Sequence, residues 1–319
     1  MRVEVASLFI FISLQCVLSE IYMIYLESFT LPSRLDEDGF ILNFPPELEM
    51  QCYNTNNAYP FKIFAQKGLS RLELSDITLI YGSNGSGKST LLNLIAEKIG
   101  AMRTSPYNTS PCFPEYLKLC RMRSSERFGV PEGSRIITSD EVFDLLIEKR
   151  EINNEISRAR DELFLEYKEE RDRDMMRLSS LDELEEFSRR LDARRLSKSQ
   201  YTARRIPKDL TGKSNGESAY IYFTKRIEEN ALYLLDEPEN SLSPALQLEL
   251  VKFIEDSARF YGCQFIISTH SPFILSMKGA RIYDLDSAPV RERRWTELEN
   301  VRLYYNFFKD REGEFEGER

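Results

Sequence analysis

The chain has 319 residues, a formal net charge of −9 at pH 7, 42% hydrophobic residues and 30% charged residues. This apolar content is sufficient for a folded core and excludes wholesale disorder. An acidic chain does not bind nucleic acid over its whole surface, so such binding would need a local basic patch. His270 is the only histidine. Metal sites and mechanisms that need two histidines from this chain are therefore excluded.

The first 22 residues are mostly apolar and allow three interpretations. From Ala6 to Leu26 the only charge is Glu20, and the run is long enough to cross a bilayer. No small-residue cleavage site follows it. The segment is then an extension upstream of a natural start at Met23, a surface strand, or a membrane or export segment. We expect the first, with residues 23–319 as a single cytoplasmic domain without a membrane partner.

The remaining elements follow in chain order. Short β-rich runs from Tyr22 to Tyr81, one of them at 61–66, predict an antiparallel sheet that leads into a buried strand. Helical spacing covers 91–99, and the Pro-, Ser- and Arg-rich stretch 102–133 indicates an irregular insertion. Residues 135–139 predict a short strand.

The stretch from Glu148 to Arg205 differs from its surroundings in its charge pattern. It contains equal numbers of basic and acidic residues and no proline. Leucines and aromatic residues recur at helical spacing, which predicts one or two long helices in a lobe inserted at about 141–213. Helix, strand, helix and strand follow through Leu285, and an acidic tail ends the chain.

A phosphate-binding loop follows the apolar run 77–81. Its residues read G-x-x-x-x-G-K-S: Gly82, Ser83, Asn84, Gly85, Ser86, Gly87, Lys88, Ser89 and Thr90. A strand precedes the motif and a helix follows it, as this motif requires. Backbone N–H groups and the helix N-terminus would surround phosphate oxygens. Lys88 would reach the β- and γ-phosphates and the Ser89 hydroxyl would bind Mg²⁺.

Two further apolar strands end in polar residues. The run 231–235 precedes Asp236 and Glu237, and the run 265–269 precedes His270. The carboxyl ends of parallel strands lie at one edge of a sheet, where ligands bind. We expect Asp236 to hold Mg²⁺, Glu237 to act as general base on the attacking water, and His270 to contact the γ-phosphate.

A short Ser- and Gly-containing segment lies between the lobe and the first of these strands. Ser214, Asn215 and Gly216 would open a helix, and a helix N-terminus is an anion site. The segment is far along the chain from the phosphate loop. It could therefore serve the nucleotide of a second subunit.

The order of these motifs resembles that of the ABC-type ATPases over roughly Met23 to Asp286. The Ser-Thr-His-Ser-Pro-Phe segment at 268–273 is more like the soluble branch, which includes chromosome-maintenance, DNA-repair and overcoming-lysogenization-defect type defence ATPases. The whole chain looks most like the stand-alone bacterial ATPases of that branch that are called AAA-family ATPases. The resemblance implies an α/β P-loop NTPase fold with an N-terminal antiparallel β subdomain, a parallel-sheet core and an inserted helical lobe.

The resemblance also implies a cofactor set and an assembly. Two copies would bind two ATP molecules, with Mg²⁺, in a head-to-tail sandwich. Ser214, Asn215 and Gly216 look like the signature that touches the partner's γ-phosphate, residues 239–244 look like the loop linking both sites, and His270 looks like the switch histidine. The segment SNGES departs from the transporter signature, and the glutamine expected after the phosphate loop is not obvious. Ser139 or Asp140 would take its place. The resemblance also implies an aromatic residue upstream of the phosphate loop that stacks on adenine, for which Tyr59 and Tyr53 are candidates.

The purpose of ATP turnover has several interpretations. Residues 189–213 contain nine Lys or Arg against two Asp, which suits either a phosphate-backbone patch or a helix face paired with acids of the same lobe. We expect a hydrolase that acts on DNA, or on a nuclease or effector partner encoded by another chain, in repair or phage defence. The alternatives are a transporter's nucleotide-binding subunit and a non-catalytic, ATP-gated scaffold.

Overall fold

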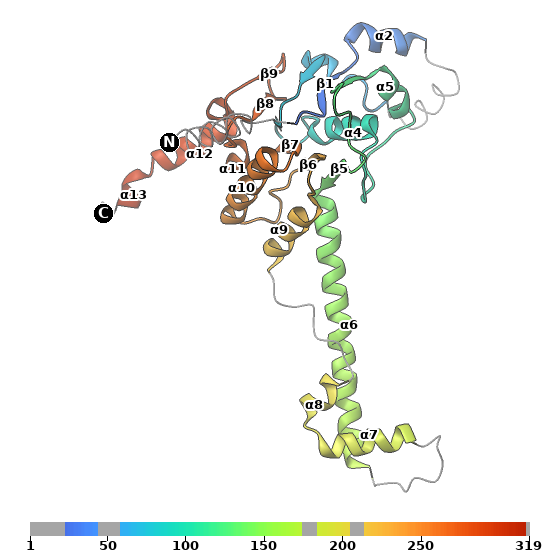
Figure 1. The fold of residues 1–319 in the computed structure, drawn as a ribbon. Coiled ribbons are helices and arrows are strands. Elements are labelled where there is room, and N and C mark those ends of the chain that lie inside the picture. Colours follow the sequence, from blue (N-terminus) through green and yellow to red (C-terminus); the bar gives the residue numbers. More distant parts are fainter. Residues whose placement is uncertain (1–22, 44–57, 174–183, 205–213, 317–319) are drawn as a thin grey trace, which may run out of the picture. The chain divides into compact units, whose positions relative to one another are not determined.

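The structure is a computed structural model that describes residues 23–43, 58–173, 184–204 and 214–316 (Figure 1). The apolar segment 1–22 lies outside these ranges, so its three interpretations stay open. Among the described residues, no helix combines the length and apolar character needed to span a membrane. The chain divides into two compact units. We call residues 1–141 with 216–319 the head, and residues 142–215 the lobe.

A six-stranded sheet forms the centre of the described head. Its strands lie in the order β5 (Arg135–Thr138), β6 (Leu232–Asp236), β7 (Gln264–Thr269), β3 (Ile77–Tyr81), β8 (Arg281–Asp284) and β9 (Arg291–Glu292). The first five strands are parallel and β9 is antiparallel to β8. Every residue of β3 and β7 is buried, as expected for strands covered on both faces. The predicted parallel-sheet core is confirmed.

A smaller antiparallel sheet provides the predicted N-terminal β subdomain. It has the order β2 (Arg71–Glu73), β1 (Leu26–Thr30) and β4 (Arg121–Ser124). The buried side chain of Gln264 at the start of β7 joins this sheet to the larger one. Its Oε1 accepts from the N–H groups of Tyr25 and Leu26, and its Nε2 donates to the carbonyls of Leu26 and Ser75. One amide thus satisfies four buried backbone groups.

Helices of the head follow the strands or precede them. They are α2 (Arg34–Leu42), α4 (Lys88–Ile99), α5 (Phe113–Leu119), α9 (Asn215–Arg226), α10 (Pro244–Phe260), α11 (Pro272–Leu275), α12 (Glu299–Lys309) and α13 (Glu312–Glu316), with 3₁₀ turns at Ala65–Lys67 and Trp295–Glu297. Helix α10 shows why they form. Ser243 caps its first turn, Pro244 stands at its start, and Leu250, Ile254 and Ser257 place one buried stripe along it.

Two expectations about local structure were wrong. The run 61–66 is not a strand but a set of turns and the 3₁₀ turn, because Phe61 and Phe64 are both buried at a spacing of three. The stretch 102–133 is not wholly irregular, since it contains α5 and β4. Strand β4 pairs with β1, which is far away in sequence, and its side chains are largely exposed. Its sequence therefore lacks the alternation of apolar and polar residues that would have predicted a strand.

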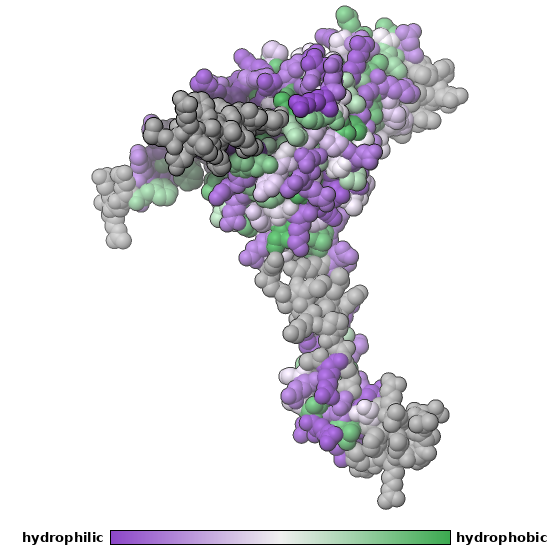
Figure 2. Space-filling view, in the orientation of Figure 1, coloured by the Kyte–Doolittle hydropathy of each residue, from purple (hydrophilic) through white to green (hydrophobic). Residues whose placement is uncertain are grey.

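The lobe consists of helices in its described part. Helix α6 (Ser139–Asp172) begins in the head and continues through the lobe, where α7 (Leu184–Arg195) and α8 (Lys198–Ala203) follow. A small core joins the three helices through Tyr167, Ala193 and Tyr201, all buried. Figure 2 shows mainly hydrophilic surface on this part of the lobe. Charged helices around a minimal core agree with the predicted pattern.

Candidate active site

The phosphate-binding loop connects β3 to α4. Gly82 follows the buried strand, and Lys88 is the first residue of the helix. Gly87 has φ = 103°, and a Cβ there would lie 3.1 Å from Ile63 and 3.2 Å from Phe64. Only glycine combines this left-handed backbone with so close a neighbour. Ser83, Asn84 and Gly85 are exposed.

Hydrogen bonds to Lys67 and Asp286 hold the phosphate-binding loop in place. Lys67 Nζ donates to the carbonyl of Ser86 at 2.7 Å and to that of Leu285 at 2.9 Å. The N–H and hydroxyl of Ser83 both donate to the Asp286 carboxylate, at 2.7 and 2.9 Å. Both Ser83 and Ser86 of the loop are thus linked to Leu285 and Asp286, which follow β8: Ser83 directly and Ser86 through Lys67. Sequence reasoning missed Lys67 and Asp286, because neither belongs to a motif.

Lys88 lies in a pocket of oxygen atoms. Its side chain is 4% exposed, and Nζ donates to the carbonyls of Gly82 at 2.9 Å and Ser83 at 3.2 Å. Oε1 of Glu237 lies 3.2 Å from the same nitrogen. A buried ammonium needs such partners, and phosphate oxygens could replace them. The loop therefore fits the phosphates of a nucleotide.

The carboxyl end of β6 presents the two acidic residues. Asp236 Oδ1 accepts from the Ser89 hydroxyl at 3.2 Å and also from the Ser268 hydroxyl of β7. Burial raises the pKa of Asp236. Ser89 and Asp236 supply only two oxygen ligands, and no group of three or more His, Cys, Asp or Glu side chains suited to a metal occurs among the described residues. Mg²⁺ typically takes one or two protein ligands besides substrate phosphates, so this pair fits it.

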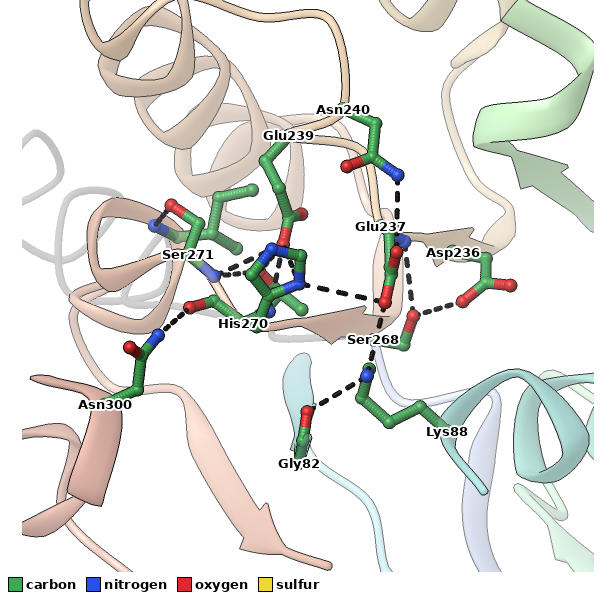
Figure 3. Close-up of polar contacts among 12 residues, drawn as sticks. Gly82, Lys88, Asp236, Glu237, Glu239, Asn240, Ser268, His270, Ser271 and Asn300 are labelled. Carbon is green, nitrogen blue, oxygen red and sulfur yellow. Dashed lines mark hydrogen bonds and ion pairs between the residues drawn. The ribbon is translucent and has the colours of Figure 1, made fainter. Parts of the chain in front are cut away.

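Glu237 is the centre of the polar contacts in Figure 3. Its φ is 47°, unusual for a residue with a side chain, and its N–H donates to the Ser268 carbonyl at 3.1 Å. Asn240 Nδ2 donates to Glu237 Oε2 at 3.2 Å. The polar contact with His270 and the charge of Lys88 lower the pKa of Glu237 to about 2. The carboxyl is therefore ionised at neutral pH.

His270 follows β7 and points toward the same carboxylate. Its Nδ1 lies 3.7 Å from Oε1 of Glu237 and 3.4 Å from Oε1 of Glu239, while 44% of its side chain is exposed. The polar contact with Glu237 raises the pKa of His270, and the charge of Glu239 adds to the effect. The three predicted residues Lys88, Glu237 and His270 are thus brought together at one edge of the sheet.

The candidate signature residues stand at the start of α9. Ser214 precedes the helix, Asn215 begins it, and both are exposed. A Cβ on Gly216 would lie 3.1 Å from the carbonyl oxygen of Ser241 and 3.1 Å from Leu246. Glycine thus allows the start of α9 to lie close to the backbone that follows Glu237. The sequence had assigned residues 214–216 to a nucleotide contact and residues 239–244 to the loop linking both sites, and their proximity was not predicted.

Two other sequence expectations concern the neighbourhood of the nucleotide. Tyr59, one candidate for stacking on adenine, donates its hydroxyl to Thr90 at 3.0 Å, and its ring stacks on Phe113. Its ring is thus already packed against an aromatic neighbour. The other candidate, Tyr53, lies outside the described residues. Ser139 and Asp140 begin α6 at the carboxyl end of β5, next to Asp236 on β6.

The basic residues of the lobe have local partners. Arg190 lies 3.3 Å from Glu170, Arg204 lies 3.5 Å from Asp192, and Arg189 lies 3.9 Å from Glu166. These contacts agree with a helix face paired with acids of the same lobe. Residues 205–213, which hold the rest of the basic stretch, lie outside the described ranges.

Comparison with known proteins places the chain in a family. A family model described as "AAA domain, putative AbiEii toxin, Type IV TA system" matches residues 77–215 and 214–276. A search of curated proteins found no match. Three solved structures are also similar to the chain.

The first is an Smc head domain from Pyrococcus furiosus with an extended coiled coil, bound to the C-terminal domain of ScpA. Its identity is 13%, with 90% of this chain and 99% of that chain covered and a TM-score of 0.40. The SMC head domain from Thermotoga maritima is 13% identical over 85% of this chain and 99% of that chain, with a TM-score of 0.34. An ATP-binding cassette in a post-hydrolysis state, bound to ADP and Pi, is 17% identical over 73% of this chain and 92% of that chain, with a TM-score of 0.33. Because the family model covers more than half of the chain, the chain belongs to this family of AAA domains, which agrees with the predicted resemblance to AAA-family ATPases.

Proposed function

We propose that this protein binds ATP with Mg²⁺ and hydrolyses it at the edge formed by the phosphate-binding loop and the ends of β6 and β7. One observation carries the proposal. Oε1 of Glu237 lies 3.2 Å from Lys88 and 3.7 Å from His270, so three polar groups from distant parts of the chain meet at one atom. Such convergence at the carboxyl ends of parallel strands is characteristic of a ligand site.

Each residue then has a definite task. Lys88 holds the β- and γ-phosphates, and Ser89 with Asp236 holds the metal ion. Bound Mg²⁺ neutralises the charge that develops on the phosphate oxygens. When the ammonium of Lys88 turns from Glu237 to the phosphates, Glu237 loses one of the contacts that lower its pKa. Its basicity rises, and the carboxylate can orient and polarise the attacking water. His270 donates to the γ-phosphate.

The assembly we propose is a head-to-tail homodimer that encloses ATP. Ser214 and Asn215 are exposed at the start of α9, and the N-terminus of a helix carries a partial positive charge that favours anions. This end of the helix would contact the γ-phosphate bound by the other copy. Gly216 against Ser241 would transmit that contact to the segment that carries Glu237.

The dimer acts, in this proposal, on a protein effector rather than directly on DNA. Four described arginines of residues 189–204 already have acidic or backbone partners, which leaves less positive charge for a phosphate backbone: Arg189, Arg190, Arg194 and Arg204. The family description refers to a toxin and a type IV toxin–antitoxin system. That wording favours a partner protein in defence. The alternatives are a nuclease partner, which co-purification would identify, and direct action on DNA in repair, which the addition of DNA tests.

The test compares ATP hydrolysis by the wild type and Glu237→Gln. Losing the base should lower turnover about 10²–10⁴-fold, while ATP still binds and a dimer accumulates in size-exclusion chromatography. The matched control is Glu255→Gln, because Glu255 accepts a backbone N–H from Lys278 away from the site. Equal turnover in both variants would contradict the catalytic proposal. ATP-dependent dimers with negligible wild-type turnover would indicate the scaffold alternative.

Double-stranded DNA is then added to the wild-type reaction. Turnover that does not change with DNA supports the effector proposal, and the partner is sought by co-purification. Stimulation by DNA would contradict it and would make residues 189–213 the next target. Co-purification of a membrane protein would indicate the transporter alternative.

A further inference from the structure

Glu239 is a buried carboxyl group for which the proposed reaction has no use. It lies two residues after Glu237, and only 5% of its side chain is exposed. Oε1 accepts three hydrogen bonds from consecutive residues: the Thr269 hydroxyl at 2.7 Å, the His270 N–H at 2.9 Å and the Ser271 N–H at 3.2 Å. Figure 3 shows Glu239 beside the His270 ring and above the end of β7. One oxygen atom therefore binds all three residues of the turn 269–271, which carries the histidine.

The second oxygen indicates that stability alone does not explain this residue. Oε2 of Glu239 is buried and has no hydrogen-bond partner among the described residues. Leaving a buried oxygen without a partner is unfavourable, and apolar side chains of similar volume often replace buried charges without loss of stability. A leucine would avoid that penalty but could not hold the turn. The glutamate is therefore better explained by what it positions.

The backbone of His270 is held from its other side as well. Asn300 at the start of α12 donates from Nδ2 to the His270 carbonyl at 2.7 Å. Its own N–H donates to the Tyr81 hydroxyl at 3.2 Å. Both backbone polar groups of His270 are thus bound by side chains that are about 30 residues away in sequence, in opposite directions.

Packing does not fix the imidazole by itself. Its side chain is 44% exposed, and His270 and Glu239 line a cavity of about 570 Å³ together with Trp295 and Tyr304. A ring with this much room is oriented mainly by polar contacts. Its Nδ1 lies within 3.4 Å of Glu239 and 3.7 Å of Glu237.

We infer that Glu239 is a positioning residue that, with Asn300, fixes the backbone and ring of His270 toward the nucleotide site. The inference rests on the proposed function for its effect on turnover, but not for its effect on the histidine. Ser271, whose N–H Glu239 accepts, also donates its hydroxyl to Gln247 Oε1 at 2.6 Å. Gln247 in turn donates to the Leu242 carbonyl at 3.0 Å. The turn 269–271 is therefore connected through Gln247 to the loop before α10.

Because His270 is the only histidine, its imidazole signals can be followed by NMR without further assignment in tag-free full-length protein. Glu239→Leu and Asn300→Leu should each move these signals. Glu239→Gln keeps an acceptor for the three donors and should move them less than Glu239→Leu. The control Glu255→Leu also removes a glutamate that accepts a backbone N–H, and it should leave the His270 signals unchanged. Superimposable His270 signals in the wild type and Glu239→Leu would overturn the inference.

Turnover supplies the second measurement. Glu239→Leu should lower kcat on the order of 10²-fold, the effect of a misplaced reacting group, while KM for ATP stays within about threefold because Lys88 keeps its contacts. Glu239→Gln should recover most of kcat. Should Glu239→Leu fail to fold, Glu239→Gln and Asn300→Leu decide the question through the same signals. A wild type without ATPase activity would contradict the proposed function, yet the NMR comparison would still test the positioning of His270.

Discussion

Charged residues are used differently in the head and in the lobe. At the edge of the parallel sheet, Lys88 meets Glu237 and Ser89 meets Asp236, and each pair is almost 150 residues apart in sequence. In the lobe, Arg173 meets Glu170 at a spacing of three, and Arg204 meets Asp192 at a spacing of 12. The first set depends on the whole sheet being formed. The second needs only helices that pack beside one another.

This difference indicates where chemistry is expected. The lobe pair Arg204–Asp192 has solvent nearby, since Arg204 is 62% exposed, and exposed pairs contribute little energy. Lys88 is 4% exposed, so its charge requires oxygen partners and can be used to bind an anion. Buried charge at long sequence separation marks the functional region of this chain better than charge density does.

The largest effect is expected for Lys88→Ala. Truncating one member of a buried charge contact costs about 2–5 kcal/mol, which is at least about thirtyfold in affinity for ATP. Lys168→Ala, on exposed α6 of the lobe, is the matched control and should leave affinity unchanged. Isothermal titration with ATP and Mg²⁺ measures both. Tight ATP binding by Lys88→Ala would contradict the view that the buried charge of the head, unlike the exposed charges of the lobe, binds the nucleotide.

Ser214→Arg should come second, because it acts in trans. Placing a long cation at the start of α9 should leave ATP affinity intact but prevent dimer formation and turnover, since the γ-phosphate contact belongs to the other copy. Ser199→Arg puts the same charge on an exposed serine of α8 and serves as control. Sedimentation with ATP and a turnover assay give the comparison. Full activity of Ser214→Arg would rule out the sandwich dimer.

Motifs identified the residues of the site, and the fold supplied what connects them. Gly82 to Thr90, Asp236, Glu237 and His270 could be named from the sequence because each follows a buried apolar strand. Glu239 and Asn300 could not, because their meaning comes from hydrogen bonds to His270 that only folding creates. A glutamate two residues beyond a catalytic candidate carries no signal in one sequence. The same limit hid β4, whose partner β1 lies about 95 residues earlier.

The predicted lobe was easier to read, since helical periodicity is a local property. Equal numbers of basic and acidic residues without proline predicted long helices, and α6, α7 and α8 are present in the described part. The pairing of its charges was left open by the sequence. It depends on α7 returning beside α6, which brings Arg190 to Glu170.

The smallest effects concern the lobe itself. Glu170 is 8% exposed and Arg190 15%, at 3.3 Å, whereas Arg204 and Asp192 are 62% and 25% exposed, at 3.5 Å. Arg190→Ala leaves a buried carboxylate with one partner fewer and should cost about 1–3 kcal/mol. Arg204→Ala should cost about 0–1 kcal/mol.

Two probes separate the lobe from the head in this measurement. Trp295, the only tryptophan, lies in the head and reports its unfolding by fluorescence, while far-UV circular dichroism also follows the helices of the lobe. Arg190→Ala should lower the denaturant midpoint of the circular dichroism transition and leave that of Trp295 unchanged, because the affected charges lie within one unit. Equal shifts of both midpoints would show that head and lobe unfold as one cooperative unit. Local pairing in the lobe would then stabilise the site as well, and the contrast between the two regions would hold for chemistry but not for stability.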